Sequence, residues 1–544
     1  MIIKSVLFLL WIVPISLCSN PHIVFIIADD MGWNDFSFHG ADQIQTPNID
    51  ALAYHGVILN QLYAQPVCTP TRAALLTGRY PSNIGMQGWP LGSAETKALP
   101  AGKILPEYLK DLGYSTYMVG KWHLGYYKEE FTPTYRGFDS HLGYLNGFIS
   151  YFDHINQEQV AYDPDMFLAG LDFRRNMTPA WDLSGRYATD VFTEEAERLI
   201  QQHNASTPMF LYLAHLAGHA GNAGKLLEAP QEVINQFSHI IEPNRKTYAA
   251  MTWNLDESVG RVVKALQANG MLENTVIVFM SDNGAPTESV VKYQNWGSNY
   301  PLRGLKTTHW EGGIRVPAVI WNHQLARRVS GELFHVTDWL PTLLAVAGGS
   351  AVDAPVDGLN QWDALMSNGT SPRTDALLLL DEVANVYAFR WGKWKLTNGT
   401  NHELQGKTDG FYGESGSSPS NPPYNITAVI HSYVGEALSN LESSIPPSEE
   451  EILEMRLEAT VSCPELSDET ACNPISNSEP CLFDLVEDPC EKNNVASSHP
   501  DVVQTMMEML SKYQESLVPQ EQVDPDIDGS DPAKYNNTWS PWKD

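Results

Sequence analysis

The chain has 544 residues, of which 43% are hydrophobic, and its formal net charge at neutral pH is −31. This length and apolar content exclude a mainly disordered chain and fit one large domain with a smaller one. The acidic balance disfavours broad binding to nucleic acid or to membrane surfaces and is typical of a solvated surface. It does not exclude an anionic substrate, because a pocket can be locally basic on an acidic body.

The first 18 residues have the pattern of a signal peptide. Lys4 precedes the apolar run 6–13, and the small residues Ser16 and Cys18 stand at cleavage positions. We therefore expect a chain of the secretory pathway, either secreted or lysosomal. No other stretch of about 20 apolar residues occurs, so we expect no membrane span. Six N-x-S/T sequons agree with this route, at Asn176, Asn204, Asn368, Asn398, Asn425 and Asn536.

Cleavage leaves five cysteines, and four of them cluster at regular spacing near the C-terminus: Cys463, Cys472, Cys481 and Cys490. No His ligands lie nearby, so the cluster favours two disulfides over a zinc site. Adjacency predicts the pairs Cys463–Cys472 and Cys481–Cys490, although four cysteines permit three pairings. Cys68 is left unpaired. In an oxidising compartment a free thiol is expected to be buried or chemically used.

Short apolar runs alternate with helical patterns over the first 280 residues. The apolar runs predict buried strands at 22–28, 115–119, 209–214 and 275–280. Helical spacing and end signals predict helices at 47–55, 71–77, 105–112, 186–202 and 245–267. Recurrent helix-to-strand units of this kind predict an α/β fold, with a large, mostly parallel mixed sheet sandwiched by helices.

The pattern changes near Asp375. Residues 387–396 alternate aromatic or apolar with polar side chains, which is typical of antiparallel strands. Ser448 and Glu451 form a capping box for a helix to about 457, and a last strand at 481–485 precedes a helix at 499–517. We therefore predict three parts: the signal peptide 1–18, a catalytic domain 19–375 and a smaller C-terminal α+β domain 376–544 containing an antiparallel sheet.

Polar side chains follow the predicted strands. They are Asp29 and Asp30, Lys121 and His123, His219, and Asp282 with Asn283. In a parallel sheet these strand ends meet at one edge, where ligands bind. Aspartate and asparagine oxygens suit calcium or magnesium better than zinc or copper. Each group alone is also compatible with a turn or a cap, but their joint occurrence favours a site.

Residues 66–78 place Cys68 just ahead of the predicted helix 71–77, where free backbone N–H groups favour an anion. Arg72 adds a fixed positive charge. A buried structural cysteine is the plainer interpretation. The complete segment, however, resembles the C-x-P-x-R motif of the type I sulfatases, followed by that family's small-apolar-Thr-Gly tail.

Three further segments carry the same resemblance. Residues 113–123 match the second sulfatase motif, 28–32 resemble the first metal-binding strand end, and 301–313 resemble the segment with the active-site lysine. The order of the motifs is similar to that of arylsulfatase B and its close relatives over about residues 22–345. The resemblance implies the alkaline phosphatase-like sulfatase fold.

The resemblance to the sulfatases also implies which residues form the active site. Cys68 would be oxidised to formylglycine by the formylglycine-generating enzyme, and its hydrate would attack sulfur. One Ca²⁺ would be bound by Asp29, Asp30, Asp282, Asn283 and the modified Cys68. Sulfate oxygens would be held by Arg72, Lys121 and Lys306. His123 would remove a proton, and His219 with Lys306 would protonate the leaving alcohol. By spacing we prefer His219 to His215, which we expect to be structural.

The resemblance thus implies a calcium-dependent sulfatase. The nearest likeness implies a sulfated N-acetylgalactosamine at a glycan end, but small plant or steroid sulfates stay open as substrates, as does the oligomeric state. A related phosphodiesterase normally needs a Ser or Thr nucleophile and two transition metals, whereas this site has one Cys and too few His ligands. A catalytically silent carbohydrate-binding relative is the alternative from a different class, and intact Cys68, Lys121, His123 and Lys306 disfavour it.

Overall fold

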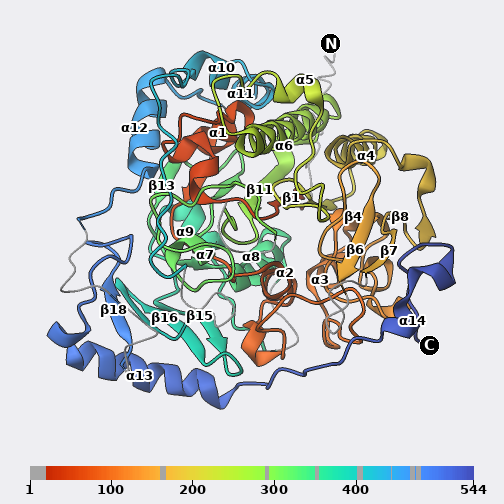
Figure 1. Cartoon of the computed structure of the whole chain (residues 1–544). Helices are drawn as coiled ribbons and strands as arrows, with labels where there is room; N and C mark the ends of the chain where they lie inside the picture. The colour runs from red at the N-terminus through yellow and green to blue at the C-terminus, as the bar shows by residue number, and fades with distance from the viewer. Residues whose placement is uncertain are drawn as a thin grey trace, which may run out of the picture.

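The structure is a computed structural model that describes residues 20–159, 167–287, 293–349, 355–400, 408–442, 444–465, 472 and 479–544 (Figure 1). The predicted signal peptide lies outside these residues. Within the described ranges, no helix is both long enough and apolar enough to cross a membrane.

A ten-stranded mixed sheet forms the centre, in the order β13-β2-β12-β11-β1-β10-β4-β5-β8-β9. The strands are β1 (His22–Ala28), β2 (Val57–Leu59), β4 (Ser115–Lys121), β5 (Ser140–Tyr144), β8 (Arg174–Arg175), β9 (Thr178–Pro179), β10 (Met209–Ala214), β11 (Thr275–Ser281), β12 (Ala318–Trp321) and β13 (Arg328–Ser330). The strands from β11 to β5 run parallel, whereas β12 and β8 are antiparallel to their neighbours. The predicted sheet is confirmed.

The predicted strands at 22–28 and 209–214 have the bounds of β1 and β10. β4 runs two residues beyond the predicted end, to Lys121, because Gly120 pairs with Ala214 on one side and Gly143 on the other. This pairing carries the strand directly to a site residue. The sequence pattern did not show it, because the glycine interrupts the apolar run.

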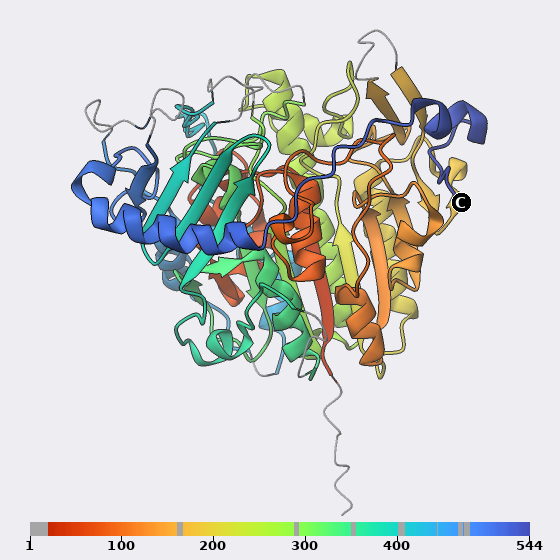
Figure 2. The ribbon, with the colours of Figure 1, turned by 90° about the horizontal axis from the view of Figure 1, so that it is seen from below.

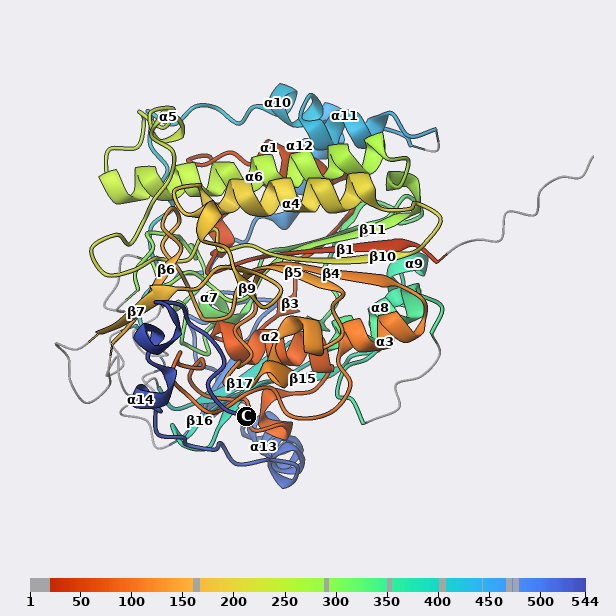
Figure 3. The same cartoon turned by 90° about the vertical axis from the view of Figure 1, so that its right-hand side faces the viewer.

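Helices cover both faces of the sheet (Figure 3). One face carries α1 (Pro47–His55), α4 (Ala188–Gln202) and α6 (Pro243–Ala268), which share a core with Val24 and Ile26. The other carries α2 (Cys68–Thr77), α3 (Leu105–Asp111) and α8 (Trp339–Val346), packed with Phe25 and Ile27. β1 is therefore buried on both faces, which explains its continuous apolar run.

Smaller elements connect these layers. They are β3 (Leu62–Tyr63) paired with β14 (Phe334–His335), the hairpin β6 (Ile155–Gln159) and β7 (Phe167–Leu171), and the short helices α5 (Gln231–Ile234), α7 (Glu311–Ile314) and α9 (Trp362–Ser367).

A separate antiparallel sheet contains β15 (Asp375–Asp381), β16 (Val386–Trp391), β17 (Trp394–Asn398) and β18 (Cys481–Asp484). This confirms the antiparallel pattern predicted at 387–396. The long helix α13 (Pro500–Glu515) lies along the sheet (Figure 2) and packs Met506 and Leu510 against Phe389 and Leu396.

Other C-terminal elements return to the large sheet. α10 (Ile426–Ile430) and α11 (Tyr433–Ser439) lie over α1, and α11 also contacts α6. α12 (Glu449–Ala459) contacts β13 of the large sheet. After α14 (Ile527–Ser530), Trp539 donates its backbone N–H to the Leu171 carbonyl of β7 at 3.0 Å, and its own carbonyl accepts from Arg174 of β8 in the large sheet. Residues after 376 thus contact both sheets, and the division into domains at that point stays a prediction.

The disulfides join Cys463 to Cys490 and Cys472 to Cys481, so the adjacent pairing predicted from the sequence was wrong. Tertiary packing decides the pairing. Cys481 begins β18, where it shares a buried cluster with Cys472 and Trp310. Cys490, beyond the turn after β18, is buried near Cys463 in a different cluster.

Candidate active site

The carboxyl ends of β1, β4, β10 and β11 meet at one edge of the sheet and deliver the predicted polar residues. Asp29 and Asp30 follow β1, His219 follows β10, and Asp282 follows β11. The structure brings together every residue that the sequence analysis proposed for this site. All of them are buried: Asp29, Asp30, Cys68, Arg72, Lys121, His123, His219, Asp282, Asn283 and Lys306.

Cys68 is the first residue of α2, so the predicted start of this helix at Thr71 was wrong. The Thr71 N–H donates to the Val67 carbonyl at 3.4 Å, which starts the helix three residues earlier. Pro70 is compatible with this start, because the first-turn N–H groups have no intrahelical partner. Burial raises the pKa of the Cys68 thiol, but Lys121 and Lys306 outweigh it and lower the pKa to about 7. Cys68 is the free cysteine of the described chain.

Asp29 lies between two cations. Lys121 Nζ is 2.7 Å from Asp29 Oδ2. On the other side, Arg72 Nη2 is 3.8 Å from Asp29 Oδ1 and donates to Asp282 Oδ2 at 2.8 Å. Burial raises the pKa of Asp29 well above its usual range, and Asp282 raises it further against the opposing lysine and arginine. Within the described chain, Asp29 Oδ1 accepts no hydrogen bond. This carboxylate therefore has unmet capacity for positive charge.

Asp30 holds the second cationic pair. Its Oδ2 is 2.6 Å from Lys306 Nζ and 3.4 Å from His219 Nε2, and its Oδ1 accepts from Asn283 Nδ2 at 2.7 Å. Burial raises the pKa of Asp30, but Lys306 and His219 prevail and lower it to about 2. In turn, burial lowers the pKa of Lys306, yet Asp30 and Cys68 raise it above its usual range. Lys306 is therefore held as a cation.

The two site histidines are oriented by backbone carbonyls. His123 Nε2 lies 2.9 Å from the Leu91 carbonyl and His219 Nδ1 lies 2.6 Å from the Ala220 carbonyl, so these nitrogens carry the protons. Burial holds the pKa of His123 well below its usual value, and the positive charge of Lys121 lowers it further. His123 Nδ1 has no partner among the described residues, and His219 Nε2 lies 3.3 Å from Lys306 Nζ.

His215 is separated from this arrangement. Its Nε2 lies 3.1 Å from Ser258 Oγ on α6, and it does not line the catalytic cavity. Burial lowers the pKa of His215 to about 3. These contacts support the structural role expected for it.

A cavity of about 410 Å³ opens over Cys68. The polar groups that line it include Cys68, His123, His219, Lys306 and the carboxylate of Glu158. Most of its walls are apolar or aromatic, formed by Val67, Trp89, Pro90, Leu91, Phe148, Pro286 and Tyr293. We call this space the catalytic cavity. The sequence analysis missed its walls because they come from separate loops without a motif; the Gly-Trp-Pro at 88–90 was the one local signal.

Arg72 and Lys121 do not line the catalytic cavity. Their side chains are fully buried against Asp29 and Asp282. Their ion pairs show that Arg72 and Lys121 neutralise these carboxylates. Direct binding of sulfate oxygens by Arg72 and Lys121 stays a prediction.

The donor atoms fit a hard cation. One ligand atom each from Asp29, Asp30, Cys68 and His219 lies within 4.8 Å of the others. Asp29 Oδ1 and Asn283 Oδ1 are buried acceptors without a partner in the described chain. Carboxylate and amide oxygens favour calcium or magnesium. A bound cation would relieve the electrostatic cost that raises the pKa of Asp29.

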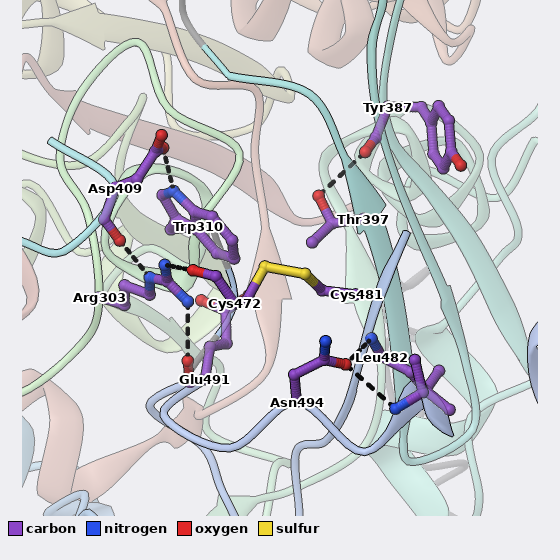
Figure 4. Close-up of a disulfide and its surroundings, with 11 residues drawn as sticks. Arg303, Trp310, Tyr387, Thr397, Asp409, Cys472, Cys481, Leu482, Glu491 and Asn494 are labelled. Carbon is purple, nitrogen blue, oxygen red and sulfur yellow. Dashed lines mark hydrogen bonds between the residues drawn. A yellow bond between two sulfur atoms is a disulfide. The ribbon is translucent and has the colours of Figure 1, made fainter. Parts of the chain in front are cut away.

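The segment that carries Lys306 is braced by the Cys472–Cys481 region (Figure 4). Arg303 donates to the carbonyls of Glu491 at 2.9 Å and Cys472 at 3.0 Å. Its guanidinium stacks 3.6 Å from the ring centre of Trp310, whose Nε1 donates to Asp409 Oδ1 at 2.8 Å. C-terminal residues therefore help to place a lysine of the site.

The sulfatase family model matches residues 21–350. Arylsulfatase J of Mus musculus is 33% identical over 535 residues, covering 96% of this chain and 80% of that protein. Arylsulfatase A of Homo sapiens is 32% identical over 412 residues, covering 71% and 77%. The chain belongs to the sulfatase family and is a sulfuric ester hydrolase of the arylsulfatase type.

Solved structures agree with the fold. The structure described as Ps i-CgsB in complex with k-i-k-neocarrahexaose has a TM-score of 0.69 and 26% identity, covering 95% of this chain and 97% of that chain. PsFucS1 sulfatase from Pseudoalteromonas sp. has a TM-score of 0.64 at 23% identity, covering 93% and 92%, and shows the fold alone. The fold is that of the alkaline phosphatase-like sulfatases.

Replacing Cys472 and Cys481 by serine should lower the free energy of unfolding by about 2–4 kcal/mol, because the cross-link no longer restricts the unfolded chain. Denaturant unfolding monitored by circular dichroism measures this loss. Unchanged stability would contradict the pairing, and disulfide mapping of the unreduced protein should recover Cys463–Cys490 and Cys472–Cys481.

Proposed function

We propose that this sulfatase uses a formylglycine made from Cys68 and a single calcium ion to hydrolyse the sulfate ester of a sugar or small molecule. The observation that carries the proposal is the position of Cys68. It lies buried at the base of the catalytic cavity, beside Asp29 and Asp30 and within the field of Lys121 and Lys306.

Calcium would be held by the oxygens of Asp29, Asp30, Asp282 and Asn283 together with the modified Cys68, and would supply positive charge for sulfate binding and for ionising the nucleophile. The chain's own cations surround this position. Lys306 reaches the cavity and would bind a sulfate oxygen, while Arg72 and Lys121 balance the carboxylates behind it. Such fixed charges stabilise the negative charge that develops during reaction.

Proton transfer is assigned from the hydrogen bonds. His123 donates through Nε2 to Leu91, so its free Nδ1 can accept a proton from the hydrated aldehyde as sulfate departs. Lys306, kept charged by Asp30, would protonate the leaving alcohol together with His219, whose Nε2 lies 3.3 Å from Lys306 Nζ and can take up and return the proton. The base is thus the unprotonated Nδ1 of His123, and the proton donor is the Lys306 ammonium.

A sulfated sugar is the substrate that we favour over a plant or steroid sulfate. N-acetylgalactosamine-6-sulfatase of Homo sapiens is 32% identical over 372 residues, and a structural neighbour was solved with an oligosaccharide. A phosphodiesterase or a silent carbohydrate-binding protein fits less well, because Cys68 occupies the nucleophile position amid a complete set of cations.

The proposal includes the secretory pathway, where formylglycine-generating enzyme would act on Cys68 and the product would be secreted or lysosomal. Two disulfides suit that oxidising environment. The signal-peptide pattern of residues 1–18 supports this route.

Peptide mass spectrometry of protein from a secretory host should find residue 68 as an aldehyde or its hydrate. Cys68→Ala should abolish turnover of an aryl sulfate while leaving the thermal midpoint nearly unchanged, because the nucleophile is lost and little packing volume is removed. Active protein with an unmodified thiol at residue 68 would refute this mechanism.

Lys306→Ala and His219→Ala should lose far more rate on alkyl or sugar sulfates than on nitrophenyl sulfate. An aryl leaving group is already stable as an anion, whereas an alkyl alcohol needs general-acid help, which is worth about 10²–10⁴-fold. The ratio of kcat/KM values across a leaving-group series measures the effect.

His215→Ala is the matched control, since His215 precedes His219 by four residues and does not line the catalytic cavity. It should show little leaving-group dependence. Equal losses across the series for Lys306→Ala and His219→Ala would instead indicate sulfate binding or structural support.

A further inference from the structure

A second cavity, of about 280 Å³, adjoins the catalytic cavity. Val67, Trp89 and Thr307 line both spaces. A group covalently attached to a unit bound over Cys68 therefore has a direct path into the second cavity. We call this space the side cavity.

Three distant parts of the chain build the side cavity. The loop after α2 supplies Trp89, the turn between β15 and β16 supplies Val383, and the segment after α13 supplies Gln520. Figure 2 shows this last segment crossing the molecule between α13 and α14.

Hydrogen bonds fix the crossing segment in place. The Val518 N–H donates to the Ser82 carbonyl at 2.8 Å, and the Asp526 N–H donates to the Ala94 carbonyl at 2.8 Å. Both acceptors flank the loop that carries Trp89. Hydrogen bonds between the C-terminal segment and the ends of the Trp89 loop therefore make the side cavity a fixed part of the fold.

The lining combines an apolar surface with hydrogen-bonding groups. Trp89 is 51% exposed and Val383 is 58% exposed, so an aromatic and an aliphatic surface face solvent beside the site. Gln520 donates through Nε2 to Asp381 Oδ1 at 2.7 Å, and both residues line the cavity. A pyranose ring has the matching character, because its C–H face stacks on an indole while its hydroxyl groups bind amides and carboxylates.

The charged groups of the two cavities differ, because the catalytic cavity is lined by Lys306 as well as by Glu158. Asp381 lines the side cavity, and Glu382 accepts from the Gln520 N–H at 2.6 Å and from Gln87 Nε2 at 2.9 Å. No lysine or arginine lines it within the described chain. A carboxylate or a second sulfate placed here would face like charge without a compensating cation.

We propose that the side cavity is a subsite for an uncharged sugar ring joined to the sulfated unit. The inference rests on the proposed function of the catalytic cavity and narrows its substrate class. The substrate is then a saccharide of at least two units, with the sulfate over Cys68 and a neutral neighbour between Trp89 and Gln520.

Four substrates test the subsite on the full-length, modified enzyme. They are nitrophenyl sulfate, N-acetylgalactosamine sulfate, and the same sulfated sugar joined either to galactose or to glucuronic acid. The galactose disaccharide should have a kcat/KM at least tenfold above that of the sulfated monosaccharide. The glucuronic acid disaccharide should fall at least tenfold below the galactose disaccharide, and Asp381→Asn should narrow that difference.

Val383→Trp fills the side cavity from an exposed position and should remove the advantage of the galactose disaccharide without changing turnover of nitrophenyl sulfate. Val486→Trp is the matched control, because Val486 is 65% exposed and lines neither cavity. It should behave like the unaltered enzyme. Gln520→Ala gives a second, smaller perturbation that should also reduce the advantage.

The two hypotheses fail in different ways. If nitrophenyl sulfate is hydrolysed but the galactose disaccharide is no better than the monosaccharide, or Val383→Trp preserves its advantage, the subsite is refuted. Equal rates on the two disaccharides refute its charge selectivity. If modified protein hydrolyses none of the four sulfates, the proposed function itself fails.

Discussion

The site depends on a balance of charges buried at the carboxyl edge of the central sheet. Three carboxylates and three cations lie together there: Asp29, Asp30, Asp282, Arg72, Lys121 and Lys306. An unpaired charge in such a place is very costly, and removing one partner of a buried pair typically costs about 3–5 kcal/mol. Each pair therefore constrains the elements that carry it.

Strand register brings these charges together. Parallel pairing of β1 with β10 and β11, and of β10 with β4, aligns the ends from which Asp29, His219, Asp282 and Lys121 emerge. α2, which packs on the same face of the sheet as α3 and α8, contributes Arg72. The 301–310 segment contributes Lys306, whose Nζ lies 2.6 Å from Asp30 Oδ2. The resulting arrangement presents Lys306 to the catalytic cavity, whereas Arg72 and Lys121 stay buried against the carboxylates.

Sequence patterns were informative wherever local chemistry decides the structure. The buried run 22–28 and the polar residues at strand ends predicted β1 and the site edge, because an interior parallel strand must be apolar until it ends. The start of α2 was missed, because Thr69 and Pro70 are weak helix formers and only the Val67 carbonyl shows where the helix begins. The disulfide pairing, the aromatic cavity walls and the side cavity all depend on contacts between distant segments, which no local pattern encodes.

The most direct test of this account is the metal content of the pure protein. After dialysis against metal-free buffer, atomic emission should find a single calcium ion per chain. Asp29→Ala and Asn283→Ala should lose it, because each removes an oxygen that has no partner in the described structure. Asp172→Asn, which alters a buried carboxylate bonded to the Leu145 and Asn146 N–H groups, should retain it. Zinc in place of calcium, or calcium retained after loss of Asp29 and Asn283, would contradict the account.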